Sequence, residues 1–175
     1  MGVPQLLLLL VSFTKGPYLQ NVSRDAITVQ WQTDVATTGT ITATPMGGGT
    51  PTTVSAPSAT FHKVRLTGLS PSTFYQYSVS AGGASAGGHF PTAVGSPDEA
   101  FEFIVYGDNK FGDGLGWCSG SYTMVRDRLI QEQVDFILHT GDMVDMGDEP
   151  HYSTFFTCYQ ELMKSHVIFP VIGNH

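Results

Sequence analysis

Three short polar motifs recur in the second half of the sequence, each directly after an apolar run: Gly107-Asp108-Asn109, Gly141-Asp142-Met143 and Gly173-Asn174-His175. Asp108 and Asp142 lie 34 residues apart, and Asp142 and Asn174 lie 32 apart. One strand–helix unit of a parallel sheet has about 30 residues, so the motifs fall at equivalent positions of successive units. Because open α/β sheets bind ligands beyond the carboxyl ends of their strands, we expect all three motifs at one crevice.

The residue types in these motifs suit a metal centre that handles phosphate. Carboxylate and amide oxygens are ligands of hard divalent cations, and two such cations about 3.5–4 Å apart can hold both the attacking and the leaving oxygens of a phosphoryl group. A histidine beside them can contact phosphate or protonate a leaving group. A single Asp after a strand is more often a turn former or a helix cap, but the ordered triple favours the metal centre.

Strands and helices that would position the motifs alternate along this half. Apolar strands are expected at 101–106, 135–140 and 167–172, and helices at 121–134 and 151–165. Near-continuous apolar strands separated by helices predict a parallel sheet in the order β-α-β-α-β. All five histidines outside the motifs are given structural interpretations, with His139 as a core residue and His62, His89, His151 and His166 as surface residues.

The first half has a different periodicity. Within residues 26–33, Ile27, Val29 and Trp31 alternate with polar residues, which is typical of a half-buried strand. Further short strands are expected at 38–44, 61–66 and 74–79, with turn clusters between them, and together they predict an all-β sandwich. The segment from Leu66 to Val79 resembles the fibronectin type III pattern, whose tyrosine, here Tyr75, would close a strand corner. The core of this domain would be built around Trp31 and its neighbours.

We therefore expect two domains: a β-sandwich over 16–93, a linker over 94–99, and the N-terminal part of an α/β domain over 100–175. Residues 1–15 are interpreted as a degraded leader, because the apolar run after Pro4 is far shorter than the roughly 20 residues of a membrane span. This favours a secreted, periplasmic or extracellular protein. No other segment is apolar enough to span a membrane, and whether Cys118 and Cys158 pair is left open.

The charge distribution excludes one class of partner. The chain has 15 acidic and 8 basic residues and a formal net charge of −7. Only Asp25 and Asp34 of these acids precede residue 98. The second half is therefore strongly acidic. It shows no nucleic-acid-binding signature, which would be basic, and its carboxylates suit a cation site.

The triple of motifs behind a β module resembles the calcineurin-like metallophosphoesterases, and the segment 16–20, Gly-Pro-Tyr-Leu-Gln, is similar to the purple acid phosphatase branch of that family. The resemblance implies hydrolysis of a phosphomonoester or phosphodiester by an acid phosphatase-like enzyme with two divalent or trivalent ions (Fe, Zn or Mn). It implies Asp108 as a ligand of the first metal, Asp142 as the bridge, Asn174 as a ligand of the second metal, and His175 as the catalytic residue that contacts phosphate.

The sequence departs from that pattern at two positions. Asp145 stands where purple acid phosphatases have a tyrosine, and Lys110 stands where other members have a histidine. We take Asp145 as a substitute metal ligand, and Lys110 with Asn109 as candidate phosphate contacts. The family's remaining histidine ligands would follow residue 175, so we expect a C-terminally truncated enzyme whose isolated chain is inactive. The alternative is a non-catalytic adhesion or binding protein that keeps a decayed phosphoesterase scaffold.

Overall fold

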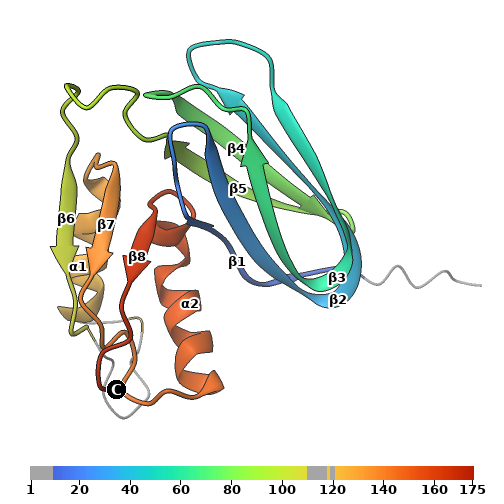
Figure 1. Ribbon diagram of the computed structural model, residues 1–175. Helices are drawn as coiled ribbons and strands as arrows, with labels where there is room; N and C mark the ends of the chain where they lie inside the picture. Colours follow the sequence, from blue (N-terminus) through green and yellow to red (C-terminus); the bar gives the residue numbers. More distant parts are fainter. Residues whose placement is uncertain (1–9, 110–117, 119–120) are drawn as a thin grey trace, which may run out of the picture.

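The computed structural model describes residues 10–109, 118 and 121–175, which form an N-terminal β part and a C-terminal α/β part in contact with each other (Figure 1). Most of the segment interpreted as a leader, residues 1–9, lies outside the described residues. Its last three residues, 13–15, already belong to the first strand.

The N-terminal part consists of antiparallel strands β1 (Phe13–Gln20), β2 (Ala26–Pro45), β3 (Thr52–Thr67), β4 (Phe74–Ala81) and β5 (Ala84–Pro91). Strand β2 pairs with β1 through its first half and with β4 through its second half, while β3 follows it along both halves. The register of β2 against β3 shifts between Gln32 and Gly39, where the pairing of β2 with β1 ends and its pairing with β4 begins. One hydrogen-bonded sheet thus folds into the sandwich-like shape seen in Figure 1.

The core of this part contains the residues that the alternation predicted. Ile27, Val29 and Trp31 are fully buried, and the hydroxyl of Tyr75 accepts a hydrogen bond from the backbone N–H of Ser70 at 2.9 Å. The predicted tyrosine corner is therefore present. His62 is buried as well, because its ring stacks on Trp31 with 4.6 Å between centroids, so the interpretation of His62 as a surface residue was wrong.

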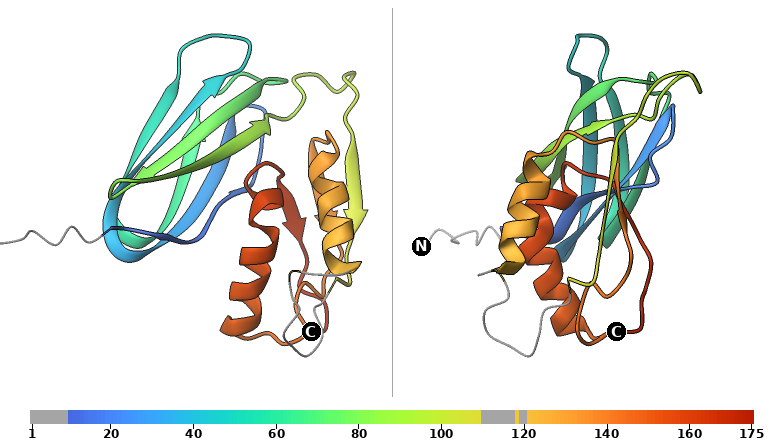
Figure 2. Two further views of the ribbon diagram at one scale, coloured as in Figure 1. Left: turned by 180° about the vertical axis from the view of Figure 1, so that it is seen from behind. Right: turned by 90° about the vertical axis from the view of Figure 1, so that its left-hand side faces the viewer.

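The C-terminal part is a parallel sheet of β6 (Phe103–Tyr106), β7 (Phe136–His139) and β8 (Ile168–Pro170), with helices α1 (Ser121–Gln131) and α2 (Glu149–Met163) on one of its faces (Figure 2). The expected β-α-β-α-β order is confirmed. Helix α2 begins two residues earlier than expected because Asp148 caps it, accepting the backbone N–H of His151 at 3.0 Å.

The two faces of this sheet differ in burial. Ile137 and Ile168 lie under the helices and are buried. On the opposite face, Phe103 is 47% exposed and Val105 is 55% exposed. Parallel sheets are normally covered on both faces. Within the described residues, the helices cover one face, and the other face is exposed at β6 while Phe136 and Phe169 pack against the core of the β part.

The two parts of the chain meet along α2. The hydroxyl of Tyr77 donates to the carbonyl of Lys164 at 2.9 Å, and the Gln160 side chain donates to the carbonyl of Gly16 at 3.1 Å. His166, just beyond α2, is buried with Nε2 2.9 Å from the carbonyl of Glu132, so it too is no surface residue. None of the described helices has the length and apolar character needed to cross a membrane.

Candidate functional site

The three polar motifs meet at the carboxyl end of the parallel sheet. Asp108 follows β6, Asp142 follows β7, and the Asn174-His175 pair follows β8. The backbone N–H of Asp108 donates to the carbonyl of Gly141 at 3.0 Å, and the N–H of Asp142 donates to the carbonyl of Ile172 at 3.2 Å. Backbone hydrogen bonds thus join each motif to the next, and the structure places them at one edge as their spacing predicted.

The carboxylate of Asp142 is held by the third motif. Its Oδ1 accepts the backbone N–H of Asn174 at 2.8 Å and that of His175 at 3.0 Å. Hydrogen bonds from backbone N–H groups to a carboxylate are charge-assisted and strong. They fix the orientation of Asp142 relative to the two residues that the sequence assigned to the same centre.

Both aspartates have an uncommon backbone conformation. The φ angle is 52° at Asp108 and 55° at Asp142, in the left-handed region that non-glycine residues seldom adopt. Such strain persists only where the surroundings enforce it, and it gathers at functional sites. The same conformation at equivalent ends of neighbouring strands makes this edge of the sheet the candidate functional site.

The glycines of the motifs permit a close approach of the chain as well as a turn. Gly173 has a φ of 82°, and a Cβ atom there would lie 2.1 Å from Oδ1 of Asp142. Gly141 has a φ of 105°, and its Cβ would lie 2.8 Å from the Cα of Gly173. Glycine is therefore required at both positions, and the carboxylate of Asp142 occupies the space that a side chain at 173 would need.

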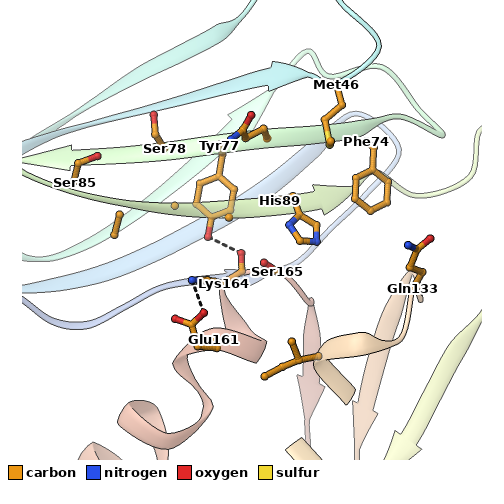
Figure 3. A pocket seen from close by; sticks show the side chains of 15 residues that line it. Met46, Phe74, Tyr77, Ser78, Ser85, His89, Gln133, Glu161, Lys164 and Ser165 are labelled. Carbon is orange, nitrogen blue, oxygen red and sulfur yellow. Dashed lines mark hydrogen bonds and ion pairs between the residues drawn. The ribbon is translucent and has the colours of Figure 1, made fainter. Parts of the chain in front are cut away.

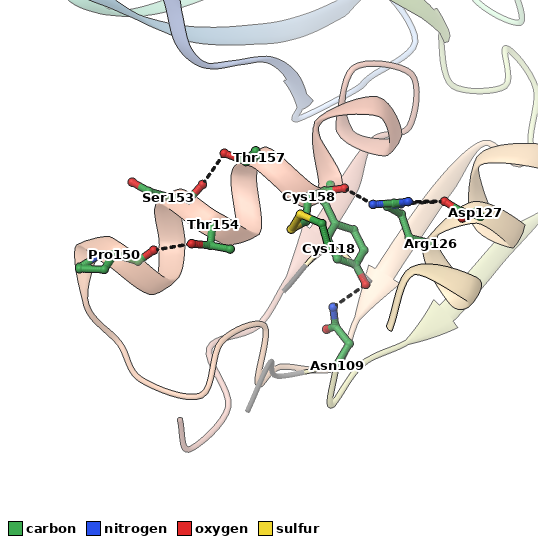
Figure 4. Close-up of a disulfide and its surroundings, with 10 residues drawn as sticks. Asn109, Cys118, Arg126, Asp127, Pro150, Ser153, Thr154, Thr157 and Cys158 are labelled. Atoms are coloured by element: carbon green, nitrogen blue, oxygen red, sulfur yellow. Dashed lines mark hydrogen bonds and ion pairs between the residues drawn. A yellow bond between two sulfur atoms is a disulfide. The ribbon is translucent and has the colours of Figure 1, made fainter. Parts of the chain in front are cut away.

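A buried histidine links the first two motifs. Nδ1 of His139 accepts the backbone N–H of Gly141 at 3.1 Å, and Nε2 lies 2.5 Å from Oδ1 of Asn109. The Asn109 amide nitrogen donates in turn to the hydroxyl of Tyr159 on α2 at 2.9 Å (Figure 4). Burial lowers the pKa of His139 to about 4, partly opposed by the negative charge of Asp142, so the imidazole is neutral near pH 7.

His139 was predicted to be a core residue, and its 2% exposure agrees. Its hydrogen bonds to the site were missed, because a histidine within an apolar strand gives no sign of what its nitrogens contact. The one available signal was its position two residues before Gly141, at the end of a strand that leads into a motif.

The remaining predicted site residues have different surroundings. Nδ1 of His175 lies 3.0 Å from the carbonyl oxygen of Asp145 and 3.5 Å from its Oδ1, so Asp145 contacts the predicted catalytic histidine. The Asn109 side chain is directed toward His139 and Tyr159. Lys110 lies outside the described residues.

The donors at this edge fit a divalent cation in kind. Two carboxylates and the Asn174 amide are the hard oxygen ligands that Mg²⁺, Mn²⁺ or Ca²⁺ take. Within residues 10–109, 118 and 121–175, however, three or more His, Cys, Asp or Glu side chains do not come together in a group that could hold a metal. The described residues therefore offer oxygen donors of the kind that hard cations take, without a complete metal-binding group among them.

A disulfide ties the loop after the first motif to the helix beneath the site. Cys118 and Cys158 are bonded, with 5.3 Å between their Cα atoms (Figure 4), which decides the pairing that the sequence left open. Cys158 precedes Tyr159 on α2, and its carbonyl accepts Nη1 of Arg126 from α1 at 2.9 Å. The disulfide thus adjoins the hydrogen bond between Asn109 and Tyr159.

A separate open groove of about 1070 Å³ lies where the two parts of the chain meet (Figure 3). Phe74 and His89 line it from β4 and β5, and an ion pair between Glu161 and Lys164 lines it from the end of α2. None of the three motifs contributes to this groove, so we do not assign it to the same site.

Comparisons with known proteins agree with this geometry. The sequence profile of the calcineurin-like phosphoesterases matches residues 101–175. A solved structure of PhoD aligns with this chain at a TM-score of 0.73 and 11% identity, and the alignment covers 99% of this chain and 42% of the PhoD chain. At such low identity the likeness shows a shared fold, and our chain spans less than half the length of PhoD.

Smaller solved domains align with the N-terminal part at lower scores. The fn3 domain of the human collagen alpha-1(XX) chain is 24% identical over 57% of this chain and 89% of that domain, with a TM-score of 0.37. The FN5 domain of Drosophila Lar is 22% identical over 46% of this chain and 99% of that domain, with a TM-score of 0.34. A search of curated protein sequences gave no match. Residues 101–175, which carry Asp108, Asp142 and the Asn174-His175 pair, belong to the calcineurin-like phosphoesterase family.

Proposed function

We propose that this chain forms part of a metal-dependent phosphoesterase in which Asp108, Asp142 and Asn174 hold divalent cations. The observation that carries the proposal is the Asp142 carboxylate, which is fixed by the N–H groups of the third motif. Asp142 is at the same time joined to the first motif through the neighbouring Gly141 carbonyl. A carboxylate between two other ligand-bearing loops has the position that a bridging ligand needs.

The chemistry follows from the donors and from His175. Bound divalent cations lower the pKa of a coordinated water and so supply a nucleophile near neutral pH. Nδ1 of His175 faces a carbonyl oxygen, that of Asp145, so Nδ1 carries the proton and Nε2 is the acceptor of the neutral ring. We propose that a protonated His175 donates through Nε2 to a phosphate oxygen or to the leaving group.

The finer assignments follow the same proposal. We propose two ions, with Fe, Zn or Mn as the candidate metals, and phosphate monoesters or diesters as substrates. Because the chain spans 42% of the PhoD chain that it resembles, the proposed hydrolysis is an activity of a protein that adds further ligands to those described. The likeness to the purple acid phosphatase branch stays a prediction.

A non-catalytic binding protein is the competing function. It is favoured by the two departures from the family pattern, since Asp145 stands where a tyrosine ligand is expected and Lys110 where a histidine ligand is expected. Such a protein would use the β part for adhesion and would keep the α/β part as a scaffold. The two functions differ in whether a cation, and phosphate after it, binds at Asp142.

The test is calorimetric titration of Mn²⁺ into the 175-residue chain, its Asp142→Asn variant and an Asp25→Asn control on the β part. Asparagine keeps the shape of the side chain and an acceptor for the N–H groups of Asn174 and His175, so the change removes mainly charge. We expect Asp142→Asn to weaken Mn²⁺ binding by at least about tenfold and the control to match the wild type. Equal Mn²⁺ affinities in all three proteins would refute the proposal.

A second titration separates the phosphoesterase from the scaffold. Inorganic phosphate should bind to the Mn²⁺-loaded chain and not to the metal-free chain, and His175→Ala should weaken that binding. The chain alone should not hydrolyse p-nitrophenyl phosphate, because its described residues supply only part of the ligand set. Phosphate affinity that is the same with and without Mn²⁺ would favour the non-catalytic function.

We also propose that the protein works outside the cytosol. Disulfides persist in oxidising compartments and are rare in cytosolic proteins, and the bond between Cys118 and Cys158 supports the localisation that the leader-like segment suggested.

A further inference from the structure

We propose that His139 is a positioning residue of the candidate metal centre, clamping the residues beside Asp108 and Asp142 through its two ring nitrogens. This inference rests on the proposed function, since the clamp matters only if the two aspartates share cations. His139 itself contacts neither cation nor substrate in this proposal.

The protonation of the ring follows from its neighbours. The backbone N–H of Gly141 can only donate, so Nδ1 of His139, 3.1 Å away, must be the acceptor. In a neutral imidazole the proton is then on Nε2, which donates to Oδ1 of Asn109. Each nitrogen therefore holds a different loop: Nδ1 holds the residue before Asp142, and Nε2 holds the residue after Asp108.

The clamp continues into the helix beneath the site. Because the oxygen of the Asn109 amide accepts from His139, its nitrogen faces Tyr159, to whose hydroxyl it donates at 2.9 Å. Tyr159 is 1% exposed and stacks on Phe155 with 4.8 Å between ring centroids. Its hydroxyl is thus a fixed point on α2, and the disulfide at Cys158 anchors the same turn of that helix (Figure 4).

The strain at the two aspartates explains why a clamp is needed. Both adopt left-handed φ angles, and such conformations persist only where surrounding contacts over-determine them. His139 is 2% exposed, so water cannot readily replace its hydrogen bonds. Mutation of residues that orient metal ligands without contacting the metal typically lowers metal affinity 10–100-fold.

Two substitutions separate the halves of the clamp. In His139→Asn the side-chain oxygen can take the place of Nδ1 and accept from Gly141, but the side chain no longer reaches Asn109. In His139→Gln the side-chain nitrogen can take the place of Nε2 and donate to Asn109, but no acceptor remains for Gly141. Tyr159→Phe removes only the hydroxyl to which the Asn109 amide nitrogen donates.

The experiment measures Mn²⁺ affinity by calorimetry for the 175-residue chain and these variants, with His89→Asn on β5 as a matched control. We expect each His139 variant to lose about 10–100-fold in affinity and Tyr159→Phe to lose affinity in the wild-type background only. In the His139→Asn background the Tyr159 change should add nothing, because the link through Asn109 is already broken. The control should bind as the wild type does.

A purely structural role would lower the denaturation midpoint of the metal-free variants and leave the Mn²⁺ affinity of the folded protein unchanged. Affinities within twofold of wild type would therefore overturn the inference and leave the proposed function standing. Failure of the wild type to bind Mn²⁺ would overturn both. If the His139 variants do not fold, ¹⁵N NMR of the wild-type imidazole decides the matter: a proton on Nε2 supports the clamp, and a proton on Nδ1 overturns it.

Discussion

Replacing Gly173 with alanine should damage the site through one added methyl group. The φ of Gly173 is 82°, which costs an L-residue about 1–2 kcal/mol. The new Cβ would also lie 2.1 Å from Oδ1 of Asp142 and 2.5 Å from its backbone nitrogen. Both contacts are far inside van der Waals distance, so the Asp142 loop has to move.

The size of the effect can be worked from these contacts. Overpacking of a well-filled region typically costs about 1–3 kcal/mol, so Gly173→Ala should lower the free energy of unfolding by about 2–5 kcal/mol in total. The displaced atom is the oxygen that accepts the N–H groups of Asn174 and His175. Mn²⁺ affinity should therefore fall by at least about tenfold.

Gly83 offers a matched control. Its φ is 91°, but nothing lies within 4 Å of the position a Cβ would take. Gly83→Ala should thus cost only the conformational part, about 1–2 kcal/mol, and should leave Mn²⁺ binding unchanged. Urea denaturation and calorimetry on the two variants give both quantities. Equal destabilisation by the two alanines, with equal Mn²⁺ affinity, would refute the claim that Asp142 fills the space beside Gly173.

Two further predictions concern pH and redox state. Burial lowers the pKa of His139 to about 4, against about 6.5 in an unfolded chain. As the pH falls from 6.5 toward 4, the unfolded chain takes up a proton that the folded chain does not. The free energy of unfolding should therefore fall through this pH range. Urea denaturation at pH 7 and pH 4.5 should show a larger loss for the wild type than for His139→Asn, and equal losses would contradict the assignment. Localisation outside the cytosol predicts that Cys118 and Cys158 are oxidised in protein from its natural source; thiol titration under denaturing conditions should find no free thiol, and two free thiols would contradict it.

Much of the architecture could be predicted because periodicity reports burial directly. The alternation around Trp31 and the spacing of Asp108 from Asp142 required no knowledge of distant contacts, and both gave the right arrangement. Strand β2 was less predictable: two strands were expected, at 26–33 and 38–44, where one long strand runs from Ala26 to Pro45. A register shift keeps such a strand continuous, and the turn-like residues Thr37, Thr38 and Gly39 conceal that continuity.

The misjudged residues are those whose surroundings come from elsewhere in the chain. His62 and His166 have polar side chains, and local sequence favours exposure for such residues. Each is buried by a remote contact, His62 against Trp31 and His166 against the carbonyl of Glu132. The pairing of Cys118 with Cys158 is another such case, because the two residues are 40 apart in sequence and meet only in the folded chain.

The position of His139 explains why one histidine can serve two motifs. In the register of the sheet it lies between Tyr106 on β6 and Pro170 on β8, and these three residues end their strands. Among the strands that the structure describes in this sheet, β7 is the one with a neighbouring motif on each side. A polar side chain at its end can therefore reach its own loop and another. Proline has no side-chain donor or acceptor, and a tyrosine has one hydroxyl at the end of a rigid ring, whereas a neutral imidazole has a donor and an acceptor on one short ring. A histidine at position 139 thus suits its place in the sheet, and an apolar side chain there would leave the Gly141 N–H and the Asn109 amide without these partners.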